Sequence, residues 1–327
     1  MADGNTGKIG GVAKGPDAQR FAVIIVHRNG AETLLRTLDA LSKATDMARD
    51  RVFLVDNGSS DDSLSRVRAA HPSAVIIENG CNLGYAAAVN RAVPESRSAF
   101  VLVLNNDAFV PPELLDRFEV LFIAHPDAAV IGPRLVSAHG DTQRSFGDEP
   151  TIWGELGIRL FQKGRPPLPD TVLTPVDWIS GACLAARRSA MEQAGSIDSG
   201  FFFYFEDVEW CIRLRRAGWR ALLDRDTRVV HLMGSSTRRV RRGAQVEMLR
   251  SRLRFYQKVF GPGVAVGLGV VRFARLAINT VSYLLLTVLT LGLVPKIRSK
   301  LLDYGYLLAW WLIGRPQRWG LPDKGKL

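Results

Sequence analysis

Residues 100–112 read FVLVLNNDAFVPP, an uninterrupted apolar run that ends in two asparagines and an aspartate. Three earlier apolar runs occupy residues 21–26, 52–55 and 74–77. The four runs end at 26, 55, 77 and 104, so 29, 22 and 27 residues separate their ends, the length of a strand plus a crossover helix. Because the runs do not alternate with polar residues, we expect strands covered on both faces, as in a parallel sheet. The pattern predicts an α/β fold with a mostly parallel sheet and flanking helices at 31–44, 61–70 and 86–93.

Polar residues follow each of the four runs directly. These clusters are residues 27–29 (HRN), 56–59 (DNGS), 79–84 (NGCNLG) and 105–107 (NND). In an open parallel sheet the carboxyl ends of the strands form the crevice where ligands bind. The alternative for any single cluster is a turn or a helix cap. Four such clusters in succession favour a ligand site at one rim of the sheet.

The second half of the chain is less periodic. Residues 140–169 contain four prolines and several glycines, which predicts a long mobile excursion. A strand at 183–186, an aromatic cluster at 201–205, a helix from Glu206 to about Ala217 and a strand from Arg220 that ends at His231 are expected beyond it. In the first half, Asp61 and Asp62 are expected in the first turn of their helix, where the helix dipole favours negative charge.

The net charge of +11 calls for an acidic partner, which means nucleotide phosphates, an anionic membrane or nucleic acid. Arg238–Arg242 is the densest basic run, with three interpretations: a solvated segment, a closure over a donor diphosphate, or a site for anionic lipid. A nucleic-acid partner is not expected, because no helix-turn-helix, zinc-finger or aromatic-platform signature is present. The cysteines, Cys81, Cys183 and Cys211, form no C-x-x-C pair, which argues against a zinc site or a disulfide framework.

The two ends of the chain differ in character from the middle. Residues 1–20 are Gly-rich and polar, which predicts a disordered leader. Residues 276–294 carry no charge, are just long enough to span a bilayer, and have basic flanks on both sides. We expect a shallow helical hairpin or an interfacial helix, with Trp310, Trp311 and Trp319 at headgroup depth. The alternatives are one true span, or a helix packed on the catalytic domain.

Seven motifs stand out along the chain: AVIIVHRN at 22–29, VDNGSSDDS at 55–63, NLGYAAAVN at 82–90, LNNDAFVPP at 104–112, DWISGACLAARR at 177–188, FFFYFEDVEWCIRLRRAGWR at 201–220 and VVH at 229–231. Together they resemble the inverting family-2 glycosyltransferases of the GT-A fold, in particular the rhamnosyltransferase-like branch of bacterial polysaccharide synthesis. The set, in the family's order, is specific, although no single motif is.

Composition at the two ends and the resemblance in the middle divide the chain into three parts. A leader at 1–20 precedes a GT-A domain at 21–260, and a helical membrane-associated tail follows at 261–327. Within the domain, residues 21–135 form the nucleotide-sugar half and residues 136–260 the acceptor half.

The resemblance also places the donor nucleotide-sugar site on His27, Asn29, Asp56, Asn82, Gly84, Arg91 and Asn106. The Asp56 carboxylate can accept hydrogen bonds from a base N–H or a ribose hydroxyl, and Gly84 lets the backbone approach the ligand. His27-Arg28 stands where the family more often has Thr-Tyr. For Arg91 the alternative is a solvated helix residue.

Asp107 and His231 are the implied ligands of a Mg²⁺ or Mn²⁺ ion that neutralises the leaving diphosphate. The family's two-acid D-x-D motif reads Asn105-Asn106-Asp107 here, so one protein carboxylate is expected. The alternatives are a turn role for Asp107 and a structural role for His231.

Asp207 is the implied general base, and Trp178, Gly181 and Glu206 lie on the implied acceptor side. An inverting transfer needs one carboxylate to take the proton of the acceptor hydroxyl. We expect the aromatic cluster at 201–205 to desolvate Asp207. The alternatives are helix capping for Asp207 and a core position for Trp178. Glu209 and Arg213 are expected to form a surface i,i+4 pair.

The resemblance therefore implies an inverting, metal-dependent hexosyltransferase. Its expected donor is a nucleoside-diphosphate sugar such as dTDP-rhamnose, and its expected acceptor is a hydroxyl of a lipid-linked glycan at the cytoplasmic face of the inner membrane. The alternatives are a catalytically silent homologue and a basic protein that binds nucleic acid or anionic lipid. The joint presence of Asp56, Asp107 and Asp207 favours the enzyme.

Overall fold

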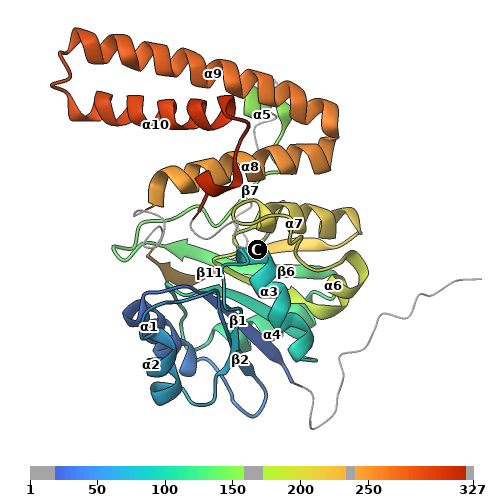
Figure 1. The fold of residues 1–327 in the computed structure, drawn as a ribbon. Coiled ribbons are helices and arrows are strands. Elements are labelled where there is room, and N and C mark those ends of the chain that lie inside the picture. Colours follow the sequence, from blue (N-terminus) through green and yellow to red (C-terminus); the bar gives the residue numbers. More distant parts are fainter. Residues whose placement is uncertain (1–18, 158–171, 233–239, 322–327) are drawn as a thin grey trace, which may run out of the picture.

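A nine-stranded mixed sheet forms the centre of the computed structural model, which describes residues 19–157, 172–232 and 240–321 (Figure 1). The strand order is β3-β2-β1-β4-β10-β6-β11-β5, and β8 pairs with β11. The strands are β1 Phe21–His27, β2 Arg51–Asp56, β3 Val75–Glu78, β4 Phe100–Asn105, β5 Ala108–Phe109, β6 Ala128–Val136, β8 Leu173–Val176, β10 Cys183–Arg187 and β11 Arg220–His231. A small second sheet pairs β7 Phe146–Gly147 with β9 Trp178–Ile179.

The first four strands of this order run parallel, and their register brings the polar clusters together. His27 is paired with Asp56 across β1 and β2, and Val26 is paired with Asn105 across β1 and β4. The carboxyl ends of these strands therefore share one rim. Beyond β4, the strand β10 runs antiparallel to both of its neighbours, and β6 and β11 run parallel to each other. The α/β class and the GT-A-like, parallel-rich sheet are confirmed.

Alternate side chains of the strands enter two hydrophobic cores, one on each face of the sheet. Val23 and Ile25 pack with α1 (Ala31–Ser42) and α4 (Leu114–Ala124) on one face. Ala22 and Ile24 pack on the other face with α3 (Tyr85–Ala92), α6 (Arg188–Ala194) and α7 (Glu206–Arg216). Each fully buried Leu, Ile or Phe in these cores contributes about 1.5–3 kcal/mol of transfer free energy. The two helical layers hold the rim rigidly between them.

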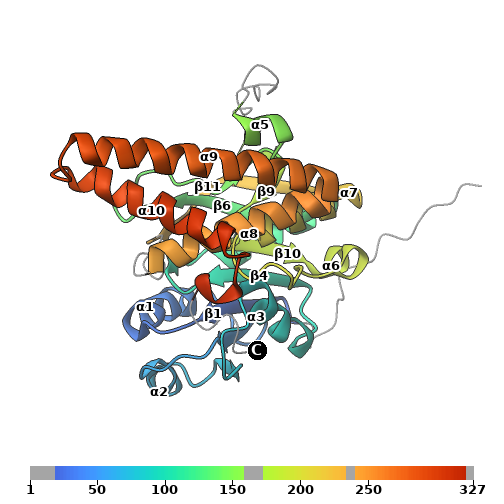
Figure 2. The same cartoon turned by 45° about the horizontal axis from the view of Figure 1, so that its top comes forward.

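Three long helices complete the fold above the second layer (Figures 1 and 2). They are α8 Arg241–Phe260, α9 Pro262–Leu289 and α10 Pro295–Leu312. Gly261 adopts a left-handed φ of 95° between α8 and α9, so the chain reverses there. In Figure 2, α9 and α10 lie side by side as a hairpin across α8. The expected helical hairpin is therefore present.

The helix α9 is the one helix of the described residues that is long and apolar enough to cross a membrane. Its most apolar window has a mean hydropathy of 1.5, and 17% of that window is buried. Trp310 is buried in the hairpin instead of lying at its surface, because it fills a cluster with Val246, Leu249 and Leu276. The expectation that Trp310 sits at headgroup depth is wrong.

Some local predictions in the first half of the chain were also wrong. Arg20, assigned to the disordered leader, is buried and forms an ion pair with Asp50 at 2.7 Å; residues 1–18 lie outside the described residues. The helix α2 begins at Ser63, so Asp61 and Asp62 precede it, and Asp61 accepts a hydrogen bond from the Gly30 N–H instead. The strand β3 is an edge strand with half-exposed side chains and is not covered on both faces.

Further corrections concern the second half. The excursion predicted over 140–169 contains the strand β7 and the short helix α5 (Ile152–Leu156), while residues 158–171 lie outside the described residues. Glu209 is not a surface residue. It is buried, and besides Arg213 it contacts Lys258 Nζ at 2.8 Å.

Candidate active site

Asp56 organises the loop that follows β2. Its carboxylate accepts hydrogen bonds from the backbone N–H groups of Gly58 (3.2 Å) and Ser59 (3.1 Å). The loop after β1 is tied to it, because Asn29 N donates to Ser59 Oγ and Ser60 N donates to Asn29 Oδ1. Asn29 adopts a left-handed φ of 57° that turns its amide toward the second loop. Asn29 and Asp56 were both expected to bind the donor nucleotide-sugar. They therefore lie in two loops of the rim that are hydrogen-bonded to each other.

Asn57 joins this rim to the loop before α3, a role that was not predicted. Its amide donates to Asn82 Oδ1 at 2.9 Å and accepts from Leu83 N at 3.0 Å. Gly84 has a φ of 87°, and a Cβ there would lie 2.7 Å from the carbonyl oxygen of Phe202. Glycine is thus required at position 84 by packing against Phe202, which gives a reason other than the expected approach to a ligand.

His27 and Asn106 contact each other at the carboxyl ends of β1 and β4. Both were also expected to bind the donor nucleotide-sugar. The Asn106 amide Nδ2 lies 2.9 Å from His27 Nδ1, and Thr37 Oγ1 donates to the Asn106 carbonyl oxygen. Burial lowers the pKa of His27 to about 4, so the imidazole is neutral at physiological pH. With Nδ1 accepting from Asn106, the proton resides on Nε2, which is buried and has no hydrogen-bond partner in the described part of the chain. That N–H is a buried donor whose hydrogen-bonding capacity is unused within the described residues.

Asp107 and His231 face each other at the end of β11. His231 Nε2 lies 3.2 Å from Asp107 Oδ1 and 3.3 Å from the amide of Asn105. Gln143 fixes the tautomer of His231, because its Nε2 donates to the His231 carbonyl oxygen (2.8 Å) and its Oε1 accepts from Nδ1 (3.1 Å). The lone pair of Nε2 then points at a carboxylate oxygen.

A carboxylate oxygen and an unprotonated imidazole nitrogen this close together can both serve as ligands of one metal ion. A divalent cation therefore fits this pair. Among the described residues no group of three or more His, Cys, Asp and Glu side chains is gathered that could hold a metal. The protein thus offers two ligands here, and a bound diphosphate has the hard oxygen atoms to supply the rest.

Tyr85 connects the Asp107–His231 pair to the expected acceptor side. Its hydroxyl lies 3.1 Å from Asn105 Oδ1 and 2.9 Å from the carbonyl oxygen of Gly181. Burial raises the pKa of Tyr85 well above its usual value, so the hydroxyl remains a donor. Gly181 N in turn donates to Asp207 Oδ2 at 2.8 Å. A continuous set of polar contacts therefore runs from Asp107 to Asp207.

Asp207 and Glu206 start α7 with contrasting environments. Both Asp207 oxygens accept backbone hydrogen bonds, Oδ2 from Gly181 and Oδ1 from Val208 (2.8 Å). Burial raises the pKa of Asp207, and these hydrogen bonds counteract the rise. Glu206 Oε2 is buried with no hydrogen-bond partner in the described residues, and burial followed by the charge of Asp207 raises the pKa of Glu206 well above its usual value. The proton of the pair therefore belongs on Glu206, and the negative charge on Asp207.

The aromatic residues Phe201, Phe203 and Phe205 belong to the hydrophobic core that packs around the start of α7. A small cavity lies beside the carboxyl groups of Glu206 and Asp207, and none of the residues 201–205 lines it. Its other lining residues are Tyr85, Val103, Gly181, Leu184, Ile197 and Trp210. The aromatic cluster also shapes the backbone, since Tyr204 and Phe205 both adopt left-handed φ values, of 71° and 66°. Such a strained pair persists only where its surroundings hold it.

Two predicted site residues lie away from this arrangement. Arg91 is exposed in the last turn of α3, which agrees with the alternative of a solvated helix residue. Trp178 is buried, packs against Gly147 and donates its indole N–H to the carbonyl oxygen of Asp148 at 3.0 Å. Its ring is part of the core, which agrees with the alternative of a core position for Trp178.

The match to known proteins covers the part of the chain that carries this rim. The family model described as glycosyl transferase family 2 matches residues 22–195, more than half of the 327 residues. The chain belongs to glycosyl transferase family 2. The predicted family and its rhamnosyltransferase-like branch are thus confirmed.

Curated relatives of this family-2 glycosyltransferase include rhamnosyltransferases. The N-acetylglucosaminyl-diphospho-decaprenol L-rhamnosyltransferase of Mycobacterium tuberculosis is 30% identical over 238 residues, which cover 66% of this chain and 77% of the relative. The low-salt glycan biosynthesis hexosyltransferase Agl10 of Haloferax volcanii is 28% identical, covering 60% of this chain and 62% of the relative.

Solved structures show the same fold at low sequence identity. The mannosyltransferase PcManGT from Pyrobaculum calidifontis, in complex with GDP-Man and Mn²⁺, has a TM-score of 0.52 at 18% identity, covering 92% of this chain and 88% of that chain. GalNAc-T7 with UDP, GalNAc and Mn²⁺ has a TM-score of 0.55 at 16% identity, covering 74% of this chain and 48% of that chain. These likenesses establish the GT-A fold of this family-2 glycosyltransferase.

Proposed function

We propose that this family-2 glycosyltransferase transfers a hexose with inversion from a nucleoside-diphosphate sugar to a hydroxyl of a lipid-linked glycan, in surface or exopolysaccharide synthesis. The observation that carries the proposal is the continuous set of contacts from the Asp107–His231 pair through Tyr85 and Gly181 to Asp207. These contacts support a charged carboxylate, Asp207, at one end of a polar path and a diphosphate site, the Asp107–His231 pair, at the other. A single displacement needs both.

Asp207 takes the proton of the acceptor hydroxyl as that oxygen attacks the anomeric carbon, and the bond to the diphosphate breaks on the opposite face. Gly181 N–H and Val208 N–H hold the carboxylate in place. Glu206 stays protonated beside it, so the charge available for proton transfer is concentrated on Asp207. Asn29, Asp56 and Asn82 bind the nucleoside, and the Nε2–H of His27 donates to it.

Asp107 and His231 would hold the divalent ion, Mg²⁺ or Mn²⁺. When bound, such an ion neutralises charge on the leaving diphosphate. The Gln143 contacts keep His231 in the tautomer that presents Nε2 to the site. Mn²⁺ in the solved relatives supports a divalent ion for the family.

The expected donor and acceptor follow from the relatives' names and the hairpin. The Mycobacterium tuberculosis relative is named for transfer of L-rhamnose to N-acetylglucosaminyl-diphospho-decaprenol, which supports an activated rhamnose such as dTDP-rhamnose as donor and a lipid-linked glycan as acceptor here. Exposed apolar residues along α9, among them Val281, Leu285 and Val288, support attachment to the cytoplasmic face of the inner membrane. We retain the division into a GT-A domain at 21–260 and a tail at 261–327, since α8 ends at Phe260.

The decisive experiment incubates the purified full-length protein with a panel of nucleotide sugars and a synthetic polyprenyl diphosphate glycan. Transfer from one donor, with the anomeric configuration of the product opposite to that of the donor, supports the proposal. A product that retains the donor configuration contradicts the single displacement. Absence of transfer and of donor hydrolysis across the panel favours the catalytically silent alternative.

A further inference from the structure

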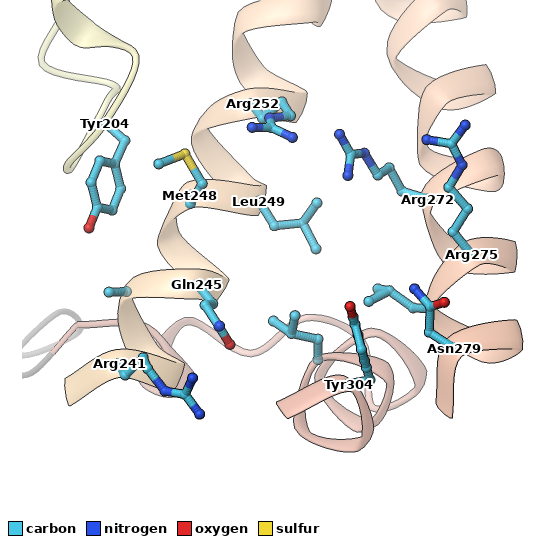
Figure 3. A pocket seen from close by; sticks show the side chains of 13 residues that line it. Tyr204, Arg241, Gln245, Met248, Leu249, Arg252, Arg272, Arg275, Asn279 and Tyr304 are labelled. Carbon is cyan, nitrogen blue, oxygen red and sulfur yellow. The ribbon is translucent and has the colours of Figure 1, made fainter. Parts of the chain in front are cut away.

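A pocket of about 660 Å³ lies between the hairpin and the catalytic domain, outside the site described above. Its walls come from α8, α9 and α10, and Tyr204 closes one side (Figure 3). Nothing in the proposed transfer chemistry uses this space. Its lining combines cationic and apolar side chains in separate parts.

The cationic part consists of four arginines, Arg241, Arg252, Arg272 and Arg275, and no acidic residue lines the pocket. In Figure 3 the guanidinium groups of Arg252 and Arg272 approach each other from facing helices. Both Nε atoms are buried and have no hydrogen-bond partner in the described residues. Burial lowers the pKa of both side chains, and for Arg272 the neighbouring Arg275 adds to the effect. Buried N–H donors on closely spaced cations favour the binding of an anion, because it accepts their hydrogen bonds and offsets their charge.

The four arginines that line the pocket outnumber the carboxylates that pair with them. Glu155 contacts both Arg252 (3.4 Å) and Arg272, and Asp303 pairs with Arg241 at 2.6 Å. Arg275 donates to backbone carbonyl oxygens of α5 and not to a carboxylate. Two carboxylates for four guanidinium groups leave a surplus of two positive charges, which matches the charge of a diphosphate.

The apolar part of the pocket points to an amphiphile and not to a soluble phosphate. Met248, Leu249, Leu276 and Leu307 line it beside the arginines. The outer surface of the same hairpin exposes apolar side chains such as Leu284 and Leu285. A small inorganic anion gains nothing from apolar walls, whereas a lipid headgroup brings its first isoprenoid or acyl carbons with it.

The pocket is also close to the general base along the chain. Tyr204 lines the pocket and precedes Asp207 by three residues. Ser251 of α8 donates to the carbonyl oxygen of Phe203 at 2.7 Å, which fastens the loop to the pocket wall. The pocket wall is therefore connected directly to the loop that leads into α7.

We propose that this pocket binds the diphosphate headgroup of the polyprenyl-linked acceptor and so selects lipid-linked over soluble acceptors. The proposal rests on the proposed function for the identity of the lipid. The guanidinium groups of Arg252 and Arg272 donate to the diphosphate oxygens, and the lipid chain leaves along the hairpin toward the bilayer.

Vesicle binding by the full-length protein tests this proposal without any need for turnover. Phosphatidylcholine vesicles carrying a polyprenyl diphosphate are compared with vesicles of equal charge carrying phosphatidylglycerol, and inorganic diphosphate is titrated separately in solution. We expect wild type to bind the polyprenyl diphosphate vesicles at least about tenfold more tightly than the phosphatidylglycerol vesicles. The double variant Arg252→Gln/Arg272→Gln should lose this preference.

A second variant guards against misfolding of the first. Asn279→Asp is nearly isosteric and adds a negative charge to the pocket lining, so it should also reduce the preference by about tenfold or more. The control Lys296→Gln/Arg298→Gln also removes two positive charges, but from the exposed start of α10, outside the pocket lining. It should weaken binding to both kinds of vesicle equally and keep the preference.

The proposal is overturned if the folded pocket variants keep the wild-type preference, or if wild type binds the two kinds of vesicle alike. It is also overturned if inorganic diphosphate alone binds as tightly as the lipid, because the pocket would then serve a soluble phosphate. A vesicle preference that depends on the arginines, in a protein that transfers no sugar, would uphold the pocket and refute the proposed function.

Discussion

The adjacent carboxyl groups of Glu206 and Asp207, at the start of α7, favour different protonation states. Asp207 accepts hydrogen bonds on both oxygens from backbone N–H groups, which favours its charged form. Glu206 has a buried oxygen without such a donor, so it retains its proton. A pair of titratable groups whose environments push their pKa values apart is typical of acid–base chemistry. This asymmetry supports the proposal that Asp207, and not its neighbour, is the base.

Replacing Asp207 by Asn should reduce turnover by roughly two to four orders of magnitude while donor binding is retained. Because an amide NH₂ would face either the Gly181 or the Val208 N–H, we also expect a stability loss of about 1–3 kcal/mol. Turnover at saturating donor and thermal unfolding measure the two effects. Glu192→Gln, which removes a negative charge from the exposed face of α6, is the control. A variant that keeps more than about a tenth of wild-type turnover would exclude Asp207 as the base.

His27 should make stability depend on pH in the acidic range. Its pKa is about 4 in the fold against 6.5 for a free imidazole, so between these values the unfolded chain binds the extra proton. Stability is therefore complete above pH 6.5 and decreases as the pH falls toward 4. His27→Gln should flatten this slope in thermal melts taken from pH 7 to pH 4. The exposed His139→Gln serves as the control, and an unchanged slope in the His27 variant would contradict the burial effect.

At the scale of the elements, the hairpin of α9 and α10 has two unlike faces. The inner face packs on α8 through Trp310 and Leu276, and the ion pair between Arg241 and Asp303 fastens it further. The outer face of α9 exposes a series of aliphatic side chains. An exposed apolar surface of this kind marks an interaction with a membrane or a partner. The basic residues at the start of α10 favour the membrane.

Substitution of that outer face should release the protein from membranes. Leu284, Leu285 and Val288 are 50%, 59% and 65% exposed, so their replacement by Gln disturbs no packing. Burial of three such side chains in a bilayer contributes about 3 kcal/mol, so the partition into membranes should fall about 100-fold. Sedimentation with native membranes measures this. Val120→Gln/Ile123→Gln on α4, with similar exposure, is the matched control; full-length protein that is soluble without detergent would refute the membrane attachment.

At the scale of the whole molecule, one sheet unites the two halves of the site. The strand β10 belongs to the second half of the chain and inserts between β4 and β6 of the first half. This insertion brings Gly181, just before β10, next to Tyr85 and Asn105. The strand β11 then carries His231 to Asp107. The donor side and the acceptor side are therefore held in one rigid layer.

This arrangement predicts a requirement for a divalent metal. Activity should be lost in EDTA and restored by Mg²⁺ or Mn²⁺, because two negative groups of the site, Asp107 and the diphosphate, otherwise repel each other. Asp107→Ala should weaken metal-dependent donor binding by about 100-fold or more, which titration calorimetry measures without turnover. The control Glu192→Ala removes an exposed carboxylate on α6. Full activity in the chelator would contradict the metal requirement and leave His231 as the group that stabilises the leaving diphosphate.

The sequence by itself determined the ends of the strands and the chemistry that follows them. Apolar runs that stop at polar residues are local features, so the positions of Asp56, Asp107 and His231 at strand ends could be read from the printed residues. The start of α7 at Glu206 was likewise predictable from its acidic first turn.

Only the tertiary structure decided which of these residues meet. Gln143 reaches His231 across 88 positions of the chain, and it lies in a segment that composition alone marked as irregular. Trp178 and Trp310 are buried because the sheet and the hairpin close over them, although both resemble surface aromatics in sequence. Local periodicity reports which face of an element is apolar, whereas the partner of that face depends on strand order and helix docking. Those are set by long-range packing, which no short stretch of residues contains.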